Sequence, residues 1–146
     1  MKILLAAIIA LSGFSGTKWL TNFDEAKTEA AQTHKNILIN FSGSDWCIPC
    51  IRMHNEIFGS EAFTKYTSDN LVLVNADFPR LKKNQLPKEQ VKQNESLADQ
   101  YNPKGHFPFT VLVDYNGKVL KQWDGLPDES ADKFVSEIET LTHAGH

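Results

Sequence analysis

Residues 37–50 read Ile-Leu-Ile-Asn-Phe-Ser-Gly-Ser-Asp-Trp-Cys-Ile-Pro-Cys, and this stretch decides the fold. Its first five residues form a short apolar run with β-branched members, which is typical of a buried strand. Residues 42–45 are small and polar and predict a loop. A helix is expected to begin at or near Cys47, because Pro49 suits a first helical turn. The stretch therefore predicts a strand, a loop and a helix that starts with two cysteines.

Further helices and strands are predicted along the rest of the chain. Helices are expected at 22–35, 47–58, 60–66, 88–101 and 128–141, strands at 71–75, 109–115 and 118–123, and a surface loop at 77–87. Asn116-Gly117 is a strong hairpin signal between the last two strands. Strands separated by helices pair in parallel through right-handed crossovers, whereas the hairpin adds an antiparallel pair. The sequence thus predicts a single α/β domain with a mixed sheet flanked by helices.

Length and composition limit the class of protein. The chain has 146 residues, of which 41% are hydrophobic and 23% charged, so one domain with one packed core is expected. Its net charge is −3, and the lysines are scattered among acidic residues. This balance argues against nucleic acid as a partner, since nucleic-acid-binding domains carry basic patches or stripes.

Residues 1–16 are interpreted as a signal peptide, and residues 17–146 as the single domain that follows it. Lys2 supplies positive charge before an unbroken apolar run over residues 3–11, and mostly small residues follow. This run is too short to span a bilayer, which takes about 20 residues. The alternative is a buried strand or helix at the start of the fold. A signal peptide implies a periplasmic or otherwise exported protein, which would contact the membrane only through an uncleaved signal.

Cys47 and Cys50 are the only two cysteines of the chain. A bridge between them closes a loop too short for a large gain in stability, so a chemical role is favoured. The N–H groups and dipole at a helix start stabilise a thiolate on Cys47, which can attack a substrate disulfide. Cys50 lies about one turn further on and can release the substrate from the mixed disulfide. The pair therefore predicts thiol–disulfide exchange.

A cysteine pair at this spacing has other possible roles. A metal site would use His54, four residues after Cys50, as a third ligand, but no fourth ligand has a convincing spacing and no metal is expected. Covalent haem attachment needs histidine directly after the second cysteine, where this chain has Ile51. The alternative function is a binding module whose cysteine pair is structural or metal-bound, with Trp46 and Phe107 as a docking surface.

Trp46-Cys47-Ile48-Pro49-Cys50, between a strand and a helix, resembles the active-site motif of the thioredoxin superfamily. Phe107-Pro108, at the start of a later strand, resembles the cis-proline segment that faces the cysteines in that family. Residues 41–47 and 94–105 resemble more narrowly the exported bacterial thioredoxin-like reductases and disulfide isomerases. The resemblance covers residues 19–141.

The resemblance implies a reductase or isomerase of protein disulfides rather than an oxidase, since Pro49 matches the proline of thioredoxin. Its only redox group would be the Cys47–Cys50 disulfide, with no further cofactor. Its partners would be protein or peptide thiols and disulfides, and a redox protein that recycles the dithiol. The implied substrate-binding residues are Trp46, Ile48, Pro49, Phe107 and Pro108, with backbone pairing of substrate along the proline segment.

The sequence departs from the thioredoxin pattern at Asn40, where thioredoxin has a buried aspartate thought to accept the proton of the resolving thiol. An amide cannot take a proton at ordinary pH. Deprotonation of Cys50 would then depend on water, on Cys47 itself, or on a nearby acid such as Asp45. Phe109 replaces the threonine that usually follows the cis-proline. His106, next to the proline segment, is expected to be a surface loop residue.

Overall fold

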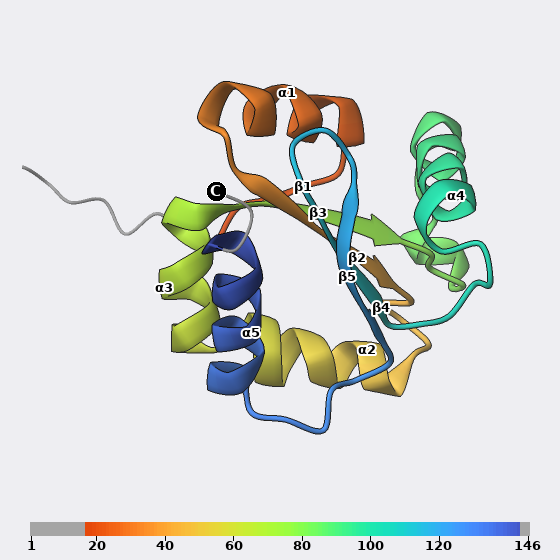
Figure 1. The fold of residues 1–146 in the computed structure, drawn as a ribbon. Coiled ribbons are helices and arrows are strands. Elements are labelled where there is room, and N and C mark those ends of the chain that lie inside the picture. The colour runs from red at the N-terminus through yellow and green to blue at the C-terminus, as the bar shows by residue number, and fades with distance from the viewer. Residues whose placement is uncertain (1–16, 144–146) are drawn as a thin grey trace, which may run out of the picture.

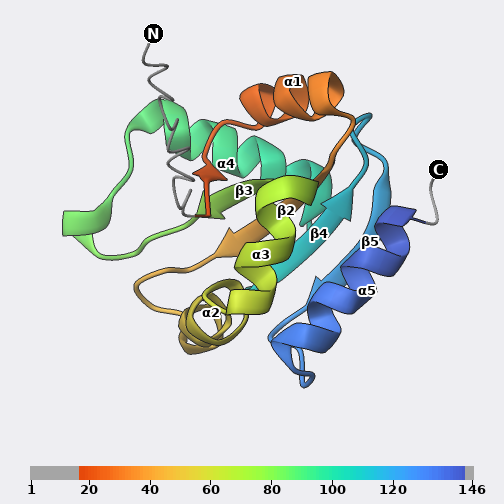
Figure 2. The same cartoon turned by 90° about the vertical axis from the view of Figure 1, so that its left-hand side faces the viewer.

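The computed structural model describes residues 17–143 and shows a five-stranded sheet between two layers of helices (Figures 1 and 2). The strands are β1 (Trp19–Leu20), β2 (Asn36–Ser42), β3 (Leu71–Asp77), β4 (Phe109–Val113) and β5 (Val119–Asp124). Their order is β1-β3-β2-β4-β5. β3 pairs in parallel with β1 and β2, whereas β4 is antiparallel to β2 and β5. The predicted mixed sheet is therefore confirmed.

Helices cover both faces of the sheet (Figures 1 and 2). They are α1 (Phe23–Thr33), α2 (Ile48–Met53), α3 (Glu61–Asn70), α4 (Lys88–Tyr101) and α5 (Ala131–His143), with a π turn at His54–Phe58 and a 3-10 turn at Lys82–Asn84. α1 and α4 lie on one face, and α2, α3 and α5 on the other. Each face of the sheet is thereby buried, which explains why its central strands are apolar on both sides.

The sheet has a hydrophobic core on each face, and the side chains of the central strand β2 point alternately into the two cores. Ile39 packs on the side of α1 and α4 with Ala26 and Leu97, and is fully buried. Leu38, the preceding residue, points to the opposite side and packs in the other core with Phe134. Successive side chains of a strand face opposite sides, so the uninterrupted apolar run of β2 serves both cores.

Side-chain caps account for the starts of two predicted helices. Asn22 caps α1, because its side-chain oxygen accepts hydrogen bonds from the N–H groups of Asp24 and Glu25. Ser60 caps α3 through the N–H of Phe63. The start of the last helix was predicted three residues too early. Ser130 supplies the first intrahelical carbonyl of α5, and residues 128–130 lie outside the helix.

The helix after the cysteines buries Met53, Ile57 and Phe58. Ile57 and Phe58 are adjacent in sequence and would point in different directions from a regular α-helix. The π turn over His54–Phe58 widens the helix by one residue per turn and turns both side chains toward the core.

Two features of the described residues were not predicted. β1 is only two residues long and pairs with β3 at the edge of the sheet, and a strand this short has no recognisable periodicity. The predicted loop at 77–87 also contains the 3-10 turn. The predicted signal peptide, residues 1–16, lies outside the described residues. Among the helices of residues 17–143, none has both the length and the apolar character needed to cross a membrane.

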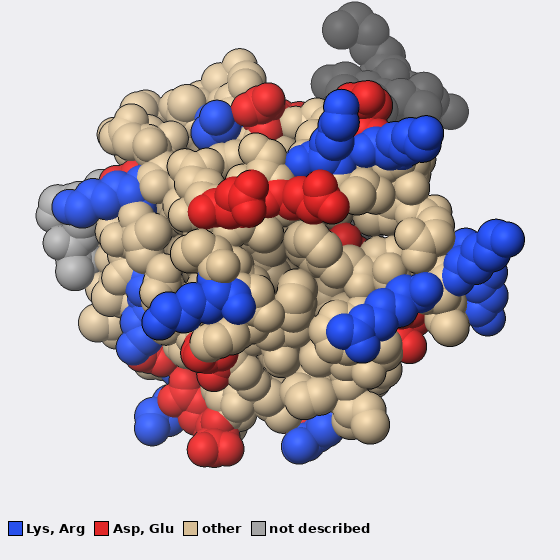
Figure 3. Space-filling model, turned by 90° about the vertical axis from the view of Figure 1, so that its right-hand side faces the viewer, with Lys and Arg blue, Asp and Glu red and all other residues tan. Residues whose placement is uncertain are grey.

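Charged side chains of both signs are interspersed on the face shown in Figure 3. Blue and red groups alternate there with wide uncharged areas, which matches the small net charge of the chain. That face therefore carries no strong field of a single sign.

Candidate active site

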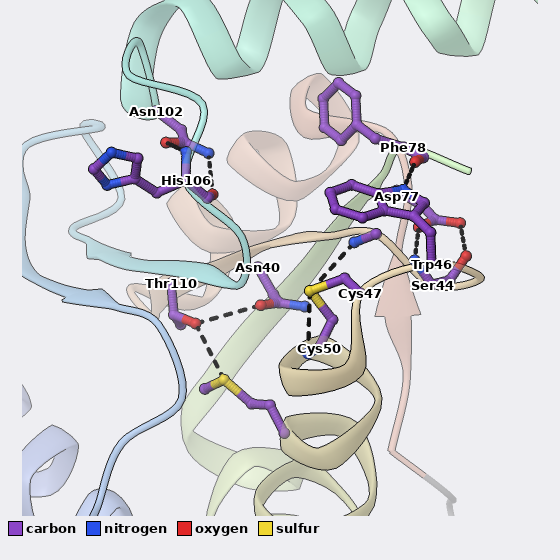
Figure 4. Close-up of a disulfide and its surroundings, with 12 residues drawn as sticks. Asn40, Ser44, Trp46, Cys47, Cys50, Asp77, Phe78, Asn102, His106 and Thr110 are labelled. Atoms are coloured by element: carbon purple, nitrogen blue, oxygen red, sulfur yellow. Dashed lines mark hydrogen bonds between the residues drawn. A yellow bond between two sulfur atoms is a disulfide. The ribbon is translucent and has the colours of Figure 1, made fainter. Parts of the chain in front are cut away.

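Cys47 and Cys50 form a disulfide at the N-terminus of α2, with Cα atoms 5.2 Å apart (Figure 4). Cys47 is the N-cap of this helix, and its Sγ accepts a hydrogen bond from the N–H of Cys50 at 3.3 Å. The two residues are almost equally buried, with 6% and 4% of their surfaces exposed. Solvent exposure therefore does not distinguish the expected attacking cysteine, Cys47, from the expected resolving cysteine, Cys50. Their positions differ, because Cys47 is the N-cap and its sulfur accepts the N–H of Cys50 in the first helical turn.

The loop before the disulfide is held by its own backbone. The carbonyl of Gly43 accepts hydrogen bonds from the N–H groups of Trp46 and Cys47, and the N–H of Gly43 donates to the Sγ of Cys50 at 3.4 Å. A Cβ atom on residue 43 would lie 2.3 Å from the indole of Trp46. Glycine is therefore required here by close packing against the indole.

Trp46 lies half-buried between the cysteine loop and two other segments. Its indole N–H donates to the carbonyl oxygen of Phe78 at 2.7 Å, and Figure 4 shows the ring directed toward Phe78. The edge of its ring meets Phe107 at a centroid distance of 5.5 Å. The guanidinium of Arg80 covers one face, 3.6 Å from the ring centroid. Trp46 thus links three segments that are far apart in the sequence.

The bond between Phe107 and Pro108 is cis, as the resemblance to thioredoxins predicts. Phe107 contacts both Trp46 and Phe78, while the carbonyl of Pro108 accepts a hydrogen bond from Gly125. The structure therefore brings the two aromatic residues of the predicted substrate-binding set into contact. Ile48, from the same set, is 71% exposed on the first turn of α2 beside the exposed Pro49.

Asn102 holds the segment that leads into the cis-proline. Its side chain accepts a hydrogen bond from the N–H of His106 and donates one to the carbonyl of the same residue (Figure 4). His106 lies on the surface as expected, but its Nδ1 is 2.7 Å from a carboxylate oxygen of Asp124. The sequence does not reveal this partner, because Asp124 reaches His106 only through the pairing of β4 with β5.

Asp45, one candidate acid for Cys50, has a different role. Its carboxylate accepts hydrogen bonds from the N–H groups of Arg80 and Leu81 and from the side chain of Asn84. The bond from the Arg80 backbone is the main cause that lowers the pKa of Asp45 below its ordinary value. Asp45 thus anchors the segment that begins at Arg80, and its lowered pKa makes it a poorer acceptor for a thiol proton than an ordinary carboxyl.

A cavity of about 360 Å³, with a lining that is more apolar than polar, adjoins Cys50 on the α2 side of the sheet. It is lined by Trp19, Asn40, Ser42, Ser44, Cys50, Ile51, His54, Phe58 and Asn75. Asn40 is buried in its wall, donates to the side chain of Asn75 at 3.1 Å and accepts from Thr110 at 3.3 Å. Asn40 therefore stands beside the resolving cysteine, as expected from the resemblance, and its amide is satisfied by two neutral partners.

Asn75 and His54 were not predicted to line a cavity with Cys50. Asn75 is a polar residue inside the apolar run 71–76, which was a visible signal of a polar environment within the sheet. His54 was considered only as a metal ligand. In residues 17–143, no group of three or more His, Cys, Asp and Glu side chains is placed to hold a metal ion.

A mixed sheet of this order, with a Cys-x-x-Cys disulfide at the helix that follows the central strand and a cis-proline at the neighbouring strand, defines the thioredoxin-fold dithiol proteins. Comparison with known proteins agrees with this class. The chain matches the family described as Thioredoxin-like over residues 18–114.

Individual relatives extend the match. The chain is 37% identical over 119 residues to the Disulfide bond reductase DsbH of Chlamydia pneumoniae, covering 82% of this chain and 69% of that protein. The solved structure of a DsbH Oxidoreductase superimposes with a TM-score of 0.79 and 31% identity over 98% of this chain and 94% of that one. A disulphide isomerase from Xylella fastidiosa Temecula1 shares the fold, with a TM-score of 0.60 and 20% identity over 80% and 88% of the two chains. This protein therefore belongs to the thioredoxin-like family.

Proposed function

We propose that this protein is a thiol–disulfide oxidoreductase that reduces or isomerises disulfides of exported proteins. The observation that carries the proposal is the Cys47–Cys50 disulfide at the N-terminus of α2, with Cys47 as the N-cap. The identity to a protein named a disulfide bond reductase supports this direction of the reaction. No cofactor is needed, because the cysteine pair itself carries the two electrons.

The reaction starts on the reduced protein. The thiolate of Cys47, stabilised by the helix N-terminus, attacks one sulfur of a substrate disulfide and displaces the other sulfur as a thiolate. Cys50 then loses its proton and attacks the Sγ of Cys47. The Cys47–Cys50 disulfide forms, the substrate leaves as a second thiolate, and a partner protein must reduce the cysteine pair before the next cycle.

The substrate surface would be the apolar ring around Cys47. Trp46 and Phe107 form one side of it, and the exposed Ile48 and Pro49 form the other. An extended substrate would pair its backbone with the segment at Pro108. Apolar contacts of this kind favour substrates whose cysteines are flanked by uncharged residues.

The apolar run at residues 3–11 supports the proposal that the protein is exported, with residues 1–16 acting as its signal peptide. In the periplasm or outside the cell, the surroundings favour disulfides. A reductase there depends on a partner that supplies electrons, and this partner sets the redox state of Cys47 and Cys50.

Insulin reduction by dithiothreitol tests the proposal. The protein should accelerate insulin precipitation, Cys47→Ser should abolish the acceleration, and Cys50→Ser should accumulate a mixed disulfide on Cys47. Both variants should retain the circular dichroism spectrum of the native fold. Full activity of Cys47→Ser would contradict the proposal.

Equilibration with glutathione buffers tests the direction of the reaction. A reductase should have a potential near that of thioredoxin, about −270 mV, whereas an oxidase would lie near that of DsbA, about −120 mV. A value close to the second would show that this protein donates disulfides.

A further inference from the structure

The cavity next to Cys50 connects a buried sulfur with an exposed imidazole. Cys50 is buried at one end, whereas His54 and Ile51 lie on the exposed surface of the helix. The backbone N–H of His54 donates to the carbonyl of Cys50, so one regular helical turn separates the two residues. Side chains four residues apart on a helix share one face and have Cβ atoms about 5–6 Å apart. A cavity of about 360 Å³ holds several water molecules.

The wall of this cavity combines apolar side chains with polar ones, and apart from Cys50 and His54 its polar groups carry no titratable proton. Its polar side chains are amides and hydroxyls, contributed by Asn40, Ser42, Ser44 and Asn75. Cys50 and His54 are the titratable residues among the described residues that line it. The wall thus has partners for water, whereas the buried carboxylate of thioredoxins is replaced by the amide of Asn40.

Charged groups near the cavity are already paired with other groups. Asp77 accepts hydrogen bonds from the N–H and hydroxyl of Ser44. Asp45 is bound to the segment that starts at Arg80. On the helix itself, Arg52 and Glu56 form an ion pair at 2.9 Å. Lys18, which precedes Trp19 in the chain, pairs with Glu29 at 3.5 Å. His54 is therefore the base that the cavity offers to Cys50.

We propose that His54 accepts the proton of Cys50 through water in this cavity, and so drives the release of substrate from Cys47. This step rests on the proposed thiol–disulfide exchange. The Cys50 thiol gives its proton to water, which passes one to the imidazole. The electron pair left on Cys50 forms the bond to the Sγ of Cys47, and the bond from Cys47 to the substrate sulfur breaks. The substrate leaves as a thiolate, and the imidazolium returns its proton to solvent.

Ellman's reagent separates the two chemical steps in one experiment. Attack by Cys47 on the reagent releases a first coloured thiolate at a rate proportional to the reagent concentration. Attack by Cys50 on the resulting mixed disulfide releases a second thiolate at a rate independent of it. His54→Gln should leave the first phase within about twofold and slow the second at least about tenfold at pH 7, since general base catalysis contributes roughly 10²–10⁴-fold.

The pH profile distinguishes proton transfer from a structural effect. Histidine ordinarily changes charge between pH 5 and 8, so the second phase of the native protein should slow as the pH falls through this range. In His54→Gln the rate of the second phase should depend only on ionisation of the Cys50 thiol, and it should increase only at higher pH. His54→Glu should restore a fast second phase at pH 7 and move its decline to lower pH, because carboxyl groups have lower pKa values. His143→Gln, on α5, is the matched control and should behave as the native protein.

Three outcomes would overturn the role of His54: a second phase in His54→Gln that matches the native rate and pH profile, an equal slowing at every pH, or no recovery in His54→Glu. Insulin reduction by the native protein distinguishes an error in the role of His54 from an error in the proposed function. If the native protein reduces insulin and the rate of the second phase does not depend on residue 54, only the role of His54 is wrong. If the native protein does not reduce insulin, the proposed function is wrong.

Discussion

At the scale of single residues, Asn40 shows how an uncharged group can occupy a buried position beside a reactive sulfur. A carboxylate there would lose its hydration on burial and have a raised pKa. The amide avoids this cost, because Asn75 and Thr110 satisfy both of its ends. The amide also leaves this position without a proton acceptor, which is the role proposed above for His54 in the same cavity.

Gly43 provides a prediction at this scale. In Gly43→Ala the new methyl group would overlap the indole of Trp46 and displace it from the carbonyl of Phe78. Overpacking of this kind costs about 1–3 kcal/mol, so the free energy of unfolding should fall by that amount in urea titrations followed by tryptophan fluorescence.

A double-mutant cycle provides the control for this prediction. In a Trp46→Ala background the overlap is absent, and the substitution of Gly43 should cost much less than in the native protein. Equal costs in the two backgrounds would show that the indole does not require glycine at this position.

At the scale of elements, Glu137 joins α5 to the edge strand β5. Its carboxylate pairs with Lys121 and accepts a hydrogen bond from the indole N–H of Trp123 at 3.2 Å. The hydrogen bond from Lys121 is the main cause that lowers the pKa of Glu137. A lowered pKa in the folded state means that this group stabilises the fold above the ordinary pKa of glutamate, and that the contribution is lost as the pH falls through the folded value.

Glu137→Gln should therefore lower the free energy of unfolding by about 1 kcal/mol at pH 7, since the pair is partly exposed to solvent. The difference from the native protein should shrink toward zero as the medium is acidified below the ordinary pKa of glutamate. Thermal unfolding of both proteins across this pH range measures the difference in stability. Glu139→Gln, an exposed position on the same helix, is the matched control and should change stability by less than about 0.5 kcal/mol.

The elements themselves were predictable where a local signal was strong. Asn22 and Ser60 mark helix starts through hydrogen bonds to N–H groups two or three residues ahead, which sequence spacing reveals. The π turn at His54–Phe58 has no such signal, because it depends on two adjacent side chains both entering the core. β1 likewise exists because β3 offers it a partner.

At the scale of the whole molecule, export is the property that the N-terminal sequence predicts. When the full chain is produced in a Gram-negative host, we expect a periplasmic product whose mass lacks about the first 16 residues, since an apolar run after a positive charge directs secretion. A chain that begins at residue 17 should stay in the cytoplasm. Intact full-length protein in the cytoplasm would contradict the signal peptide.

The residues from 37 to 50 by themselves determined the strand, the loop and the helix with its cysteine pair, because these depend on apolar periodicity and on helix-start chemistry within a few residues. Only the tertiary structure decided what surrounds the disulfide. Trp46 meets Phe107 from a distant segment, Asn75 reaches Asn40 from the next strand, and residues of α2, β2 and β3 together line the cavity at Cys50. These contacts join segments distant in sequence, and they form only when the cores on both faces of the sheet have fixed the strand register and the placement of α2.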